Sequence, residues 1–195
     1  MNRRRLLIGT GAGIAAIAAV WILVSWRSRV NGPDATGTEA APQQQGSTAE
    51  RKIAATLFYI TEDGMSLQPV QRDVSFGEPI TEQARRIVEA QITAPPAPLA
   101  GAIPDGTKLR ALYVTDRGDA FVDLTGEVSA KHTGGALDEL FTVYAIVNAL
   151  TVNLPAITRV QILIDGKEAD TLAGHVDLRH PLARSLKWIK ADNPS

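Results

Sequence analysis

Residues 135–178 read GALDELFTVYAIVNALTVNLPAITRVQILIDGKEADTLAGHVDL, and this stretch decides the fold. When its first part is wound at about 100° per residue, the apolar side chains cover roughly half of the circumference. Three polar residues and one apolar exception lie on the opposite side: Asp138, Glu139, Thr142 and Ile146. Pro155 cannot continue a helix, and it biases the residue before it out of the α region. We therefore predict an amphipathic helix over residues 135–153.

The residues after the proline predict a strand, a turn and a returning strand. Residues 159–164, RVQILI, are rich in β-branched side chains and almost continuously apolar, which is typical of a central strand with one face on a helix. Asp165-Gly166 is a strong signal for a tight turn between two strands. The returning strand is expected to begin at Thr171-Leu172.

Asn148 falls on the apolar face of the predicted helix. A buried amide that finds no hydrogen-bond partner costs about 1–3 kcal/mol, so this side chain must be paired. A structural asparagine bonded to nearby backbone is the favoured interpretation. A contact with a ligand is the alternative.

The chain upstream repeats this arrangement of helix and strand pairs. The expected elements are a strand over 53–61, a turn at 63–64, a strand over 67–76, a helix from 79 to the proline pair at 95–96, and a hairpin of strands 109–115 and 120–124. The whole order is β-β-α-β-β-α-β-β, with an imperfect internal repeat. We predict an α/β (α+β) domain over residues 53–189, in which two helices and a mixed, largely antiparallel sheet form two layers. A short tail, residues 190–195, follows it.

The N-terminus has the features of a membrane anchor. Residues 1–5 are a basic tail, and the uncharged run after them would form a helix of about 28 Å, close to the hydrocarbon thickness of a bilayer. We predict a transmembrane signal-anchor over residues 6–26 and a disordered linker over residues 27–52. A cleaved signal peptide is the alternative. Basic residues that flank a membrane helix usually stay on the cytoplasmic side, so we expect residues 1–5 to lie in the cytoplasm. The C-terminal domain is then expected to be extracytoplasmic, in the periplasm or on the outer face of the cell membrane.

Charge and cysteine content narrow the possible partners. Residues 53–195 contain 13 basic and 18 acidic side chains, a net charge of −5, and the whole chain contains no cysteine. An acidic domain without a basic stripe is a poor nucleic-acid binder. Gly9 and Gly13 have the spacing of small residues at which two membrane helices approach closely, so self-association is one possible partner interaction.

Candidate catalytic and metal-binding residues are few. The histidines are His132, His175 and His180, and the run His175-Val-Asp-Leu-Arg-His180 places three possible ligands within six residues. Zinc ligands on one helix or across strands are spaced differently, and we expect this run to be a loop in which Asp177 accepts backbone hydrogen bonds. Asp123 and Asp165 lie near strand ends, where glycosidase carboxylates can lie. The turn explains Asp165 and strand alternation explains Asp123, so we predict no enzyme, no metal and no cofactor.

Several segments, in order, resemble the GerMN domain family, which includes GerM-like sporulation and germination proteins and LpqB-like lipoproteins. They are Ile103-Pro-Asp-Gly-Thr-Lys-Leu109, Phe121-Val-Asp-Leu124, Tyr144-Ala-Ile-Val-Asn-Ala-Leu-Thr151, Val160-Gln-Ile-Leu-Ile-Asp-Gly166 and Thr171-Leu-Ala-Gly-His-Val-Asp-Leu178. The residues of structural or motif interest are therefore Asn148, Asp165, Gly166, Gly174, His175 and Asp177. Two departures are Ala173, where a second glycine is common, and the absence of a cysteine that could carry a lipid.

The resemblance implies a non-catalytic, membrane-anchored domain that binds other envelope proteins during sporulation, germination or envelope assembly. Exposed sheet edges and helix faces would be its docking surfaces. Two alternatives remain open at this point. One is a module that binds cell wall or a small ligand, and the other is a cell-wall hydrolase that uses Asp123, His175 or Asp177.

Overall fold

The computed structural model describes residues 51–190. The predicted basic tail, signal-anchor and most of the linker lie outside the described residues, as does nearly all of the C-terminal tail. Within the described part, no helix combines the length and the apolar character needed to cross a bilayer.

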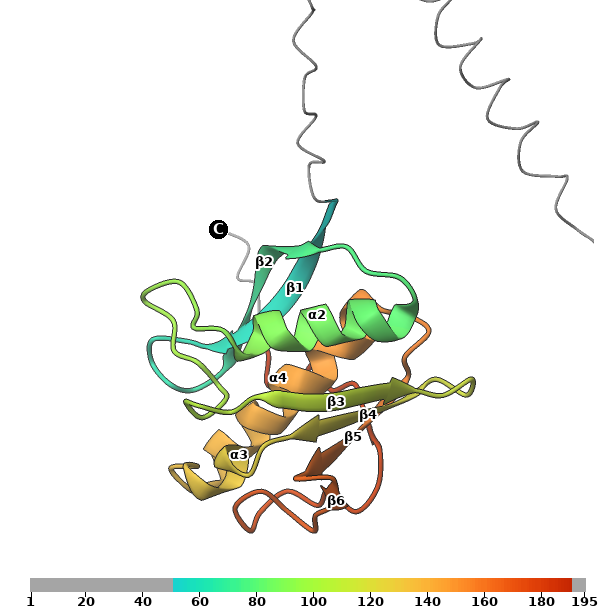
Figure 1. Cartoon of the computed structure of the whole chain (residues 1–195). Coiled ribbons are helices and arrows are strands. Elements are labelled where there is room, and N and C mark those ends of the chain that lie inside the picture. The colour runs from blue at the N-terminus through green and yellow to red at the C-terminus, as the bar shows by residue number, and fades with distance from the viewer. Residues whose placement is uncertain (1–50, 191–195) are drawn as a thin grey trace, which may run out of the picture. The chain divides into compact units, whose positions relative to one another are not determined.

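Ten helices and strands make up the described part of the chain (Figure 1). In chain order they are β1 (Lys52–Ile60), β2 (Leu67–Ser75), α2 (Ile80–Ile92), β3 (Leu109–Val114), β4 (Asp119–Leu124), α3 (Glu127–Ala130), α4 (Ala136–Asn153), β5 (Arg159–Ile164), β6 (Lys167–Glu168) and β7 (Leu182–Ala183). The five longest strands and both long helices lie within one or two residues of their predicted limits at most ends. The short helix α3 and strand β7 had no signal in the sequence.

The strands form two sheets rather than one. β1 and β2 pair as an antiparallel hairpin, and this hairpin is a sheet of its own. The second sheet has the order β3-β4-β5-β6, and β7 also pairs with β5. Its β4 and β5 are parallel and are joined through α3 and α4, whereas its other pairs are antiparallel. The predicted mixed, largely antiparallel sheet is therefore present, and the N-terminal hairpin is separate from it.

The predicted returning strand at residues 171–172 is wrong. The chain returns at once after the Asp165-Gly166 turn as the two-residue β6, and β5 gains its second antiparallel partner from β7. The segment after β6 cannot extend the sheet because the backbone N–H groups of Leu172 and His175 donate instead to the carboxylate of Glu139 on α4.

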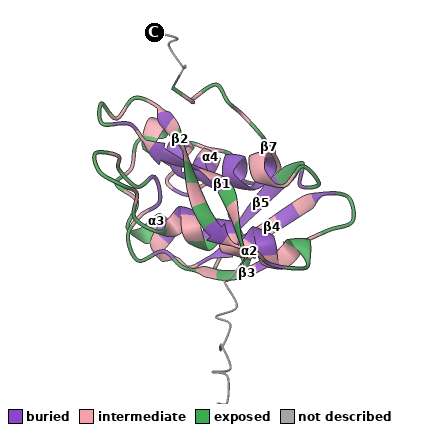
Figure 2. Cartoon of the chain, turned by 90° about the horizontal axis from the view of Figure 1, so that it is seen from above, coloured by how far each residue is buried: buried purple, intermediate pink, exposed green. Residues whose placement is uncertain are grey.

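Helix α4 is the centre of the domain and contacts both β1 and β5 (Figure 1). The prediction of one polar side is wrong for this helix, because Glu139, Thr142 and Ile146 are as buried as the apolar face. Most residues of α4 are buried, and much of this helix has the colour of buried residues in Figure 2. Helices covered on all sides are apolar nearly all round, and the four buried polar side chains of α4 are all hydrogen-bonded: Glu139, Thr142, Asn148 and Thr151. The hairpin sheet, the helices and the larger sheet therefore replace the two layers that the sequence predicted.

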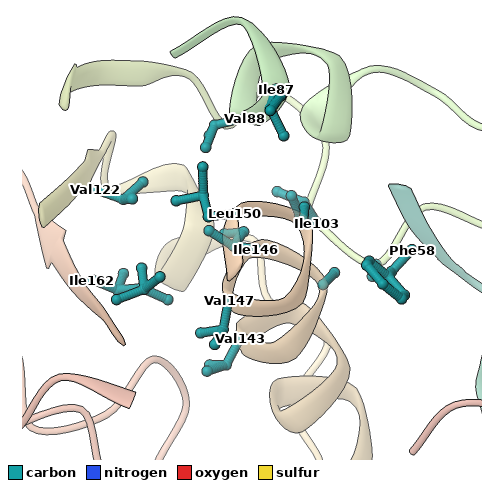
Figure 3. Close-up of a cluster of buried hydrophobic side chains, with 14 of the residues drawn as sticks. Phe58, Ile87, Val88, Ile103, Val122, Val143, Ile146, Val147, Leu150 and Ile162 are labelled. Carbon is teal, nitrogen blue, oxygen red and sulfur yellow. The ribbon is translucent and has the colours of Figure 1, made fainter. Parts of the chain in front are cut away.

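Figure 3 shows how the core is arranged around α4. The helix contributes Val143, Ile146, Val147 and Leu150, all fully buried. The labelled side chains around it come from both sheets, from α2 and from the loop after it: Phe58, Ile87, Val88, Ile103, Val122 and Ile162. One contiguous core thus joins the elements.

Amide side chains of the two long helices close the free edge of β1. Asn153 of α4 accepts a hydrogen bond from the Thr56 N–H at 2.8 Å and donates one to the Thr56 carbonyl at 2.7 Å. Gln91 of α2 makes the same pair of bonds with Phe58, at 2.8 and 2.7 Å. These side chains satisfy the backbone groups of a strand edge that would otherwise be open to pairing with another chain.

Candidate functional site

An open groove of about 470 Å³ lies where β1 and α2 end and α4 begins. Its apolar walls are Ile60, Ile92, Pro95, Ile103 and Pro104. Three charged side chains stand on its rim: Asp105, Lys131 and Asp138. The loops that follow α2 and α3 and the first turns of α4 therefore build one site from segments far apart in the sequence.

A chain of hydrogen bonds through His132 fixes the walls of this groove. The Gly134 N–H donates to Nδ1 of His132 at 3.0 Å, so the ring proton is placed on Nε2. Nε2 then donates to Oγ1 of Thr142 at 3.2 Å, and the Thr142 hydroxyl donates to the Ala102 carbonyl at 2.5 Å. The loop around residue 102, the loop around residue 132 and α4 are thus held together, and the groove is formed before anything binds.

The charges on the rim are not balanced. Hydrogen bonding from Thr125 lowers the pKa of Glu127, and the nearby charge of Lys131 lowers it further, so Lys131 is already close to a carboxylate. Asp105 and Asp138 have no ion-pair partner among the described residues. Asp138 accepts only a long hydrogen bond, 3.4 Å, from the Thr133 hydroxyl. The groove therefore combines apolar walls with a rim on which the carboxylates of Asp105 and Asp138 outnumber the one ammonium group, that of Lys131.

A second polar site lies on another side of the same helix, around Glu139. This side chain is 0% exposed, and its carboxylate accepts hydrogen bonds from the N–H groups of Leu172 and His175, both at 2.8 Å. Nδ1 of His175 lies 3.0 Å from the same carboxylate. We call Glu139 and residues 172–176 the carboxylate cradle. It ties the loop after β6 to the first turn of α4.

Two opposing effects act on the carboxyl group in the cradle. Burial is the larger single influence and raises the pKa of Glu139, but the backbone N–H groups of residues 172–176 together outweigh it. They hold the pKa below its usual value of 4.5, so the group is ionised at neutral pH. A buried charge satisfied by several donors of the same domain is a structural feature, because both carboxylate oxygens are already engaged inside the domain.

The run from His175 to His180 does not gather ligands. His175 faces Glu139, whereas Asp177 accepts bonds from the guanidinium and the backbone N–H of Arg179. The Arg179 side chain and N–H lower the pKa of Asp177. Gly174 has φ +102°, and its N–H donates to the Thr171 hydroxyl. Among residues 51–190, no cluster of His, Asp and Glu has a geometry that would hold a metal ion.

Asp123, Asp165 and Gly166 come together at the end of β5. The Asp123 carboxylate lies 3.1 Å from the Arg110 guanidinium and accepts the Gly166 N–H at 2.7 Å. Asp165 accepts the Gly126 N–H at 3.2 Å and lies 3.9 Å from Arg110. Both turn residues have positive φ, 50° and 78°, as a tight hairpin turn requires. These carboxylates join the β4 strand end to the β5–β6 turn.

Asn148 makes both of its amide hydrogen bonds with one residue of the C-terminal segment. Its Nδ2 donates to the Ser185 carbonyl at 2.8 Å, and its Oδ1 accepts the Ser185 N–H at 3.1 Å. This fully buried side chain therefore fixes the segment after β7 against α4. Such pairing is typical of a structural asparagine.

Sequence reasoning missed the residues that matter most in both sites. Glu139 was placed on a solvent side, and its partners lie 33 and 36 residues further along the chain, a separation that no local pattern reveals. Asp105, Asp138 and Thr142 had no motif that would connect them. The Asp105-Gly106 turn signal was visible, but its position on the rim of a groove depends on the packing of α4.

Comparison with known proteins gives one family and a small group of similar structures. The profile of the Germane family, described as sporulation and spore germination, matches residues 56–170. Among solved structures, the tandem GerMN domains of the sporulation protein GerM from Bacillus subtilis are 17% identical with a TM-score of 0.56, and the match covers 67% of this chain and 46% of that one. The first GerMN domain of the same protein is 18% identical with a TM-score of 0.53, covering 68% and 98%.

A third structure, from Clostridium perfringens and described as a lipoprotein, is 24% identical with a TM-score of 0.49, covering 68% of this chain and 87% of that one. The chain spans about half of the tandem GerM structure. No curated protein matches this sequence. The similarity to the two GerM structures shows a shared fold.

Proposed function

The chain belongs to the Germane family of sporulation and spore germination domains, and from this premise we propose that it is a non-catalytic assembly domain that binds another protein of the cell envelope. In this proposal residues 6–26 anchor the chain in the membrane and the described domain lies outside the cytoplasm. Cell fractionation tests this location. A full-length product that is freely soluble in the cytosol would overturn it.

The groove beside α4 is the observation that carries the proposal. It is held open by internal hydrogen bonds, its walls are apolar, and its rim carries two carboxylates that form no ion pair with another described residue. The centre of a protein interface is typically apolar, and its polar rim selects the partner by charge. A preformed groove also reduces the entropy lost on binding.

The edges of the N-terminal hairpin, β1 and β2, support the groove as the preferred docking surface. Asn153 and Gln91 occupy the outer backbone groups of β1. On β2, Pro69 lies opposite Phe58 and has no N–H to donate. An added strand would therefore find a closed edge on β1 and an interrupted one on β2, whereas the groove is open.

The state of the candidate catalytic residues supports a non-catalytic role. Asp123, His175 and Asp177 each face a different partner within the domain: Arg110, Glu139 and Arg179. A general acid or nucleophile needs a free position beside a reacting atom. In the proposed function these side chains stabilise loops.

Site-specific photocrosslinking in the source organism tests the proposal. A photoreactive residue at Ala94, on the rim of the groove, is compared with one at Ala54, an exposed position on β1 away from it. We expect the full-length chain to form a specific adduct with an envelope protein from position 94 and not from position 54. Equal adducts from both positions, or none from position 94, would contradict a partner at the groove.

A module for cell-wall fragments or another small ligand is the second candidate, and the size of the groove favours it. A volume of about 470 Å³ lies within the range of roughly 300–1,000 Å³ that is usual for ligand sites. Titration of the chain with soluble wall fragments, followed by NMR, separates the two candidates. Shifts confined to groove residues at low ligand concentration would favour the ligand module over the protein-binding role.

A further inference from the structure

A tight turn near the C-terminus presents an apolar side chain to solvent. The Ile189 N–H donates to the Leu186 carbonyl at 3.2 Å, which closes a turn over residues 186–189. Leu186 is 54% exposed, and it is one of four large apolar side chains that are exposed among the described residues. We call residues 184–188 the basic turn, because Arg184 and Lys187 flank this leucine.

The basic turn is held rigidly on both sides. Near its start, Ser185 is fixed by the two hydrogen bonds to Asn148, at 2.8 and 3.1 Å. At its end, the Leu67 N–H donates to the Trp188 carbonyl at 2.7 Å, and just beyond it the Lys190 N–H donates to the Leu67 carbonyl at 2.8 Å. Leu186 is therefore presented in one conformation, and little further ordering is needed when it binds. These hydrogen bonds hold the basic turn in place, and none of its residues lines the groove of the same chain. The turn is therefore available to a second chain.

The charge of this segment is opposite to that of the remaining domain. Residues 178–190 contain four Lys or Arg and no Asp or Glu, whereas residues 51–177 contain eleven Lys or Arg and seventeen Asp or Glu. Arg184 and Lys187 form no ion pair with another described residue. The basic turn thus carries uncompensated positive charge around an exposed apolar tip.

The groove has the complementary pattern, with apolar walls and a rim on which the carboxylates of Asp105 and Asp138 outnumber the ammonium group of Lys131. We propose that the basic turn of one copy of this chain docks into the groove of a second copy, with Leu186 against the apolar walls and Lys187 beside the acidic rim. This inference rests on the proposed protein-binding role of the groove. The contact joins two different surfaces, so each pair of copies retains one free turn and one free groove.

The contact is small and therefore weak in dilute solution. One turn in one groove falls at the low end of protein interfaces, below about 1,200 Å² of buried surface, where encounters are transient. Attachment of both copies to one membrane would raise their effective concentration, and a weak contact would then be populated. Ionic strength would oppose it, because exposed charges are screened by salt.

Disulfide trapping tests the contact, since the full-length chain contains no cysteine of its own. A chain with Leu186→Cys and a differently tagged chain with Ala94→Cys are expressed together and treated with a mild oxidant. We expect mixed dimers on a non-reducing gel. The matched control replaces Leu186→Cys with Met65→Cys, because Met65 is 68% exposed and so more accessible than Leu186. We expect several-fold more mixed dimer from Leu186 than from Met65.

Charge reversal supplies the second readout. Lys187→Glu is expected to lower trapping between positions 186 and 94, and Asp138→Lys on the partner chain is expected to restore it. Trapping from Leu186 no greater than from Met65, or trapping that charge reversal leaves unchanged, would overturn the inference. The experiments also distinguish failure of the contact between copies from failure of the proposed protein-binding role. A photoadduct with a different envelope protein from position 94, without disulfide trapping, would retain the protein-binding role and remove only the contact between copies.

Discussion

Asp138 and Glu139 are neighbours in sequence, carry the same charge and lie in the first turn of α4, yet their surroundings are opposite. Asp138 is exposed on the rim of the groove and has no ion-pair partner among the described residues. Glu139 is fully buried and accepts hydrogen bonds from a loop more than 30 residues away in sequence. One step along a helix turns a side chain by about 100°, which is enough to separate these two environments.

The difference teaches how to distinguish a structural carboxylate from one that is available for binding. In the carboxylate cradle, Glu139 accepts from the backbone N–H groups of Leu172, Ala173, His175 and Val176, so the fold depends on that charge. On the rim, water satisfies Asp138 equally well in the folded and unfolded chain, so the charge adds little to stability. It remains free to meet a positive group of a partner.

Removal of the cradle carboxylate gives the largest expected effect. Glu139→Ala leaves several backbone N–H groups without an acceptor inside the domain, and removing one member of a buried charged cluster costs about 3–5 kcal/mol. We expect the free energy of unfolding, measured in urea, to fall by that amount. Amide hydrogen exchange of residues 172–176 should become much faster. A loss below about 1 kcal/mol, within the range of an ordinary single hydrogen bond, would contradict the central role of the cradle.

The dependence of stability on pH tests whether Glu139 is ionised in the folded domain. Because the folded-state pKa of Glu139 lies below its unfolded value of 4.5, its ionised form stabilises the domain above that pH. This contribution is lost as the pH falls below 4.5 and through the folded-state pKa. In Glu139→Gln the contribution is absent at every pH.

The difference in unfolding free energy between wild type and Glu139→Gln should therefore shrink on acidification below pH 4.5. Other carboxyl groups titrate in both proteins and cancel in this difference. A difference that does not change with pH would mean that Glu139 is not ionised in the folded domain.

Asp138→Asn gives the smallest expected effect on stability. The side chain is exposed and its single hydrogen bond is long, at 3.4 Å, so the free energy of unfolding should change by less than about 0.5 kcal/mol. Chemical denaturation of Asp138→Asn and Glu139→Ala under the same conditions compares the loss of unfolding free energy in the two variants. A loss above 1 kcal/mol would show that the two carboxylates do not differ as the structure indicates.

The main elements of the fold could be predicted because their signals are local. The helix expected over residues 135–153 is observed as Ala136–Asn153, and the strand expected over residues 159–164 is observed at those residues. Pro155 and the Asp165-Gly166 turn act through their own backbone, whatever surrounds them. The resemblance to the GerMN family, carried by segments of this kind, is confirmed by the family match over residues 56–170.

The errors share one cause, which is contact between segments far apart in sequence. Ile146 was an unexplained apolar residue on a polar side, and the hairpin sheet explains it by covering that side of α4. The returning strand at residues 171–172 was plausible from its composition. It fails because Glu139 captures the backbone donors of that segment.

The sequence by itself determined the approximate limits of the two long helices and the five longest strands, the family, and the acidic character of the domain, since these depend on neighbouring residues or on composition alone. Only the tertiary structure decided that α4 is buried between two sheets, that Glu139 is structural while Asp138 is exposed, and that a groove and a basic turn carry complementary charge. The physical reason is that burial and hydrogen-bond partnership are properties of pairs of residues. Packing brings those pairs together from positions that no local pattern connects.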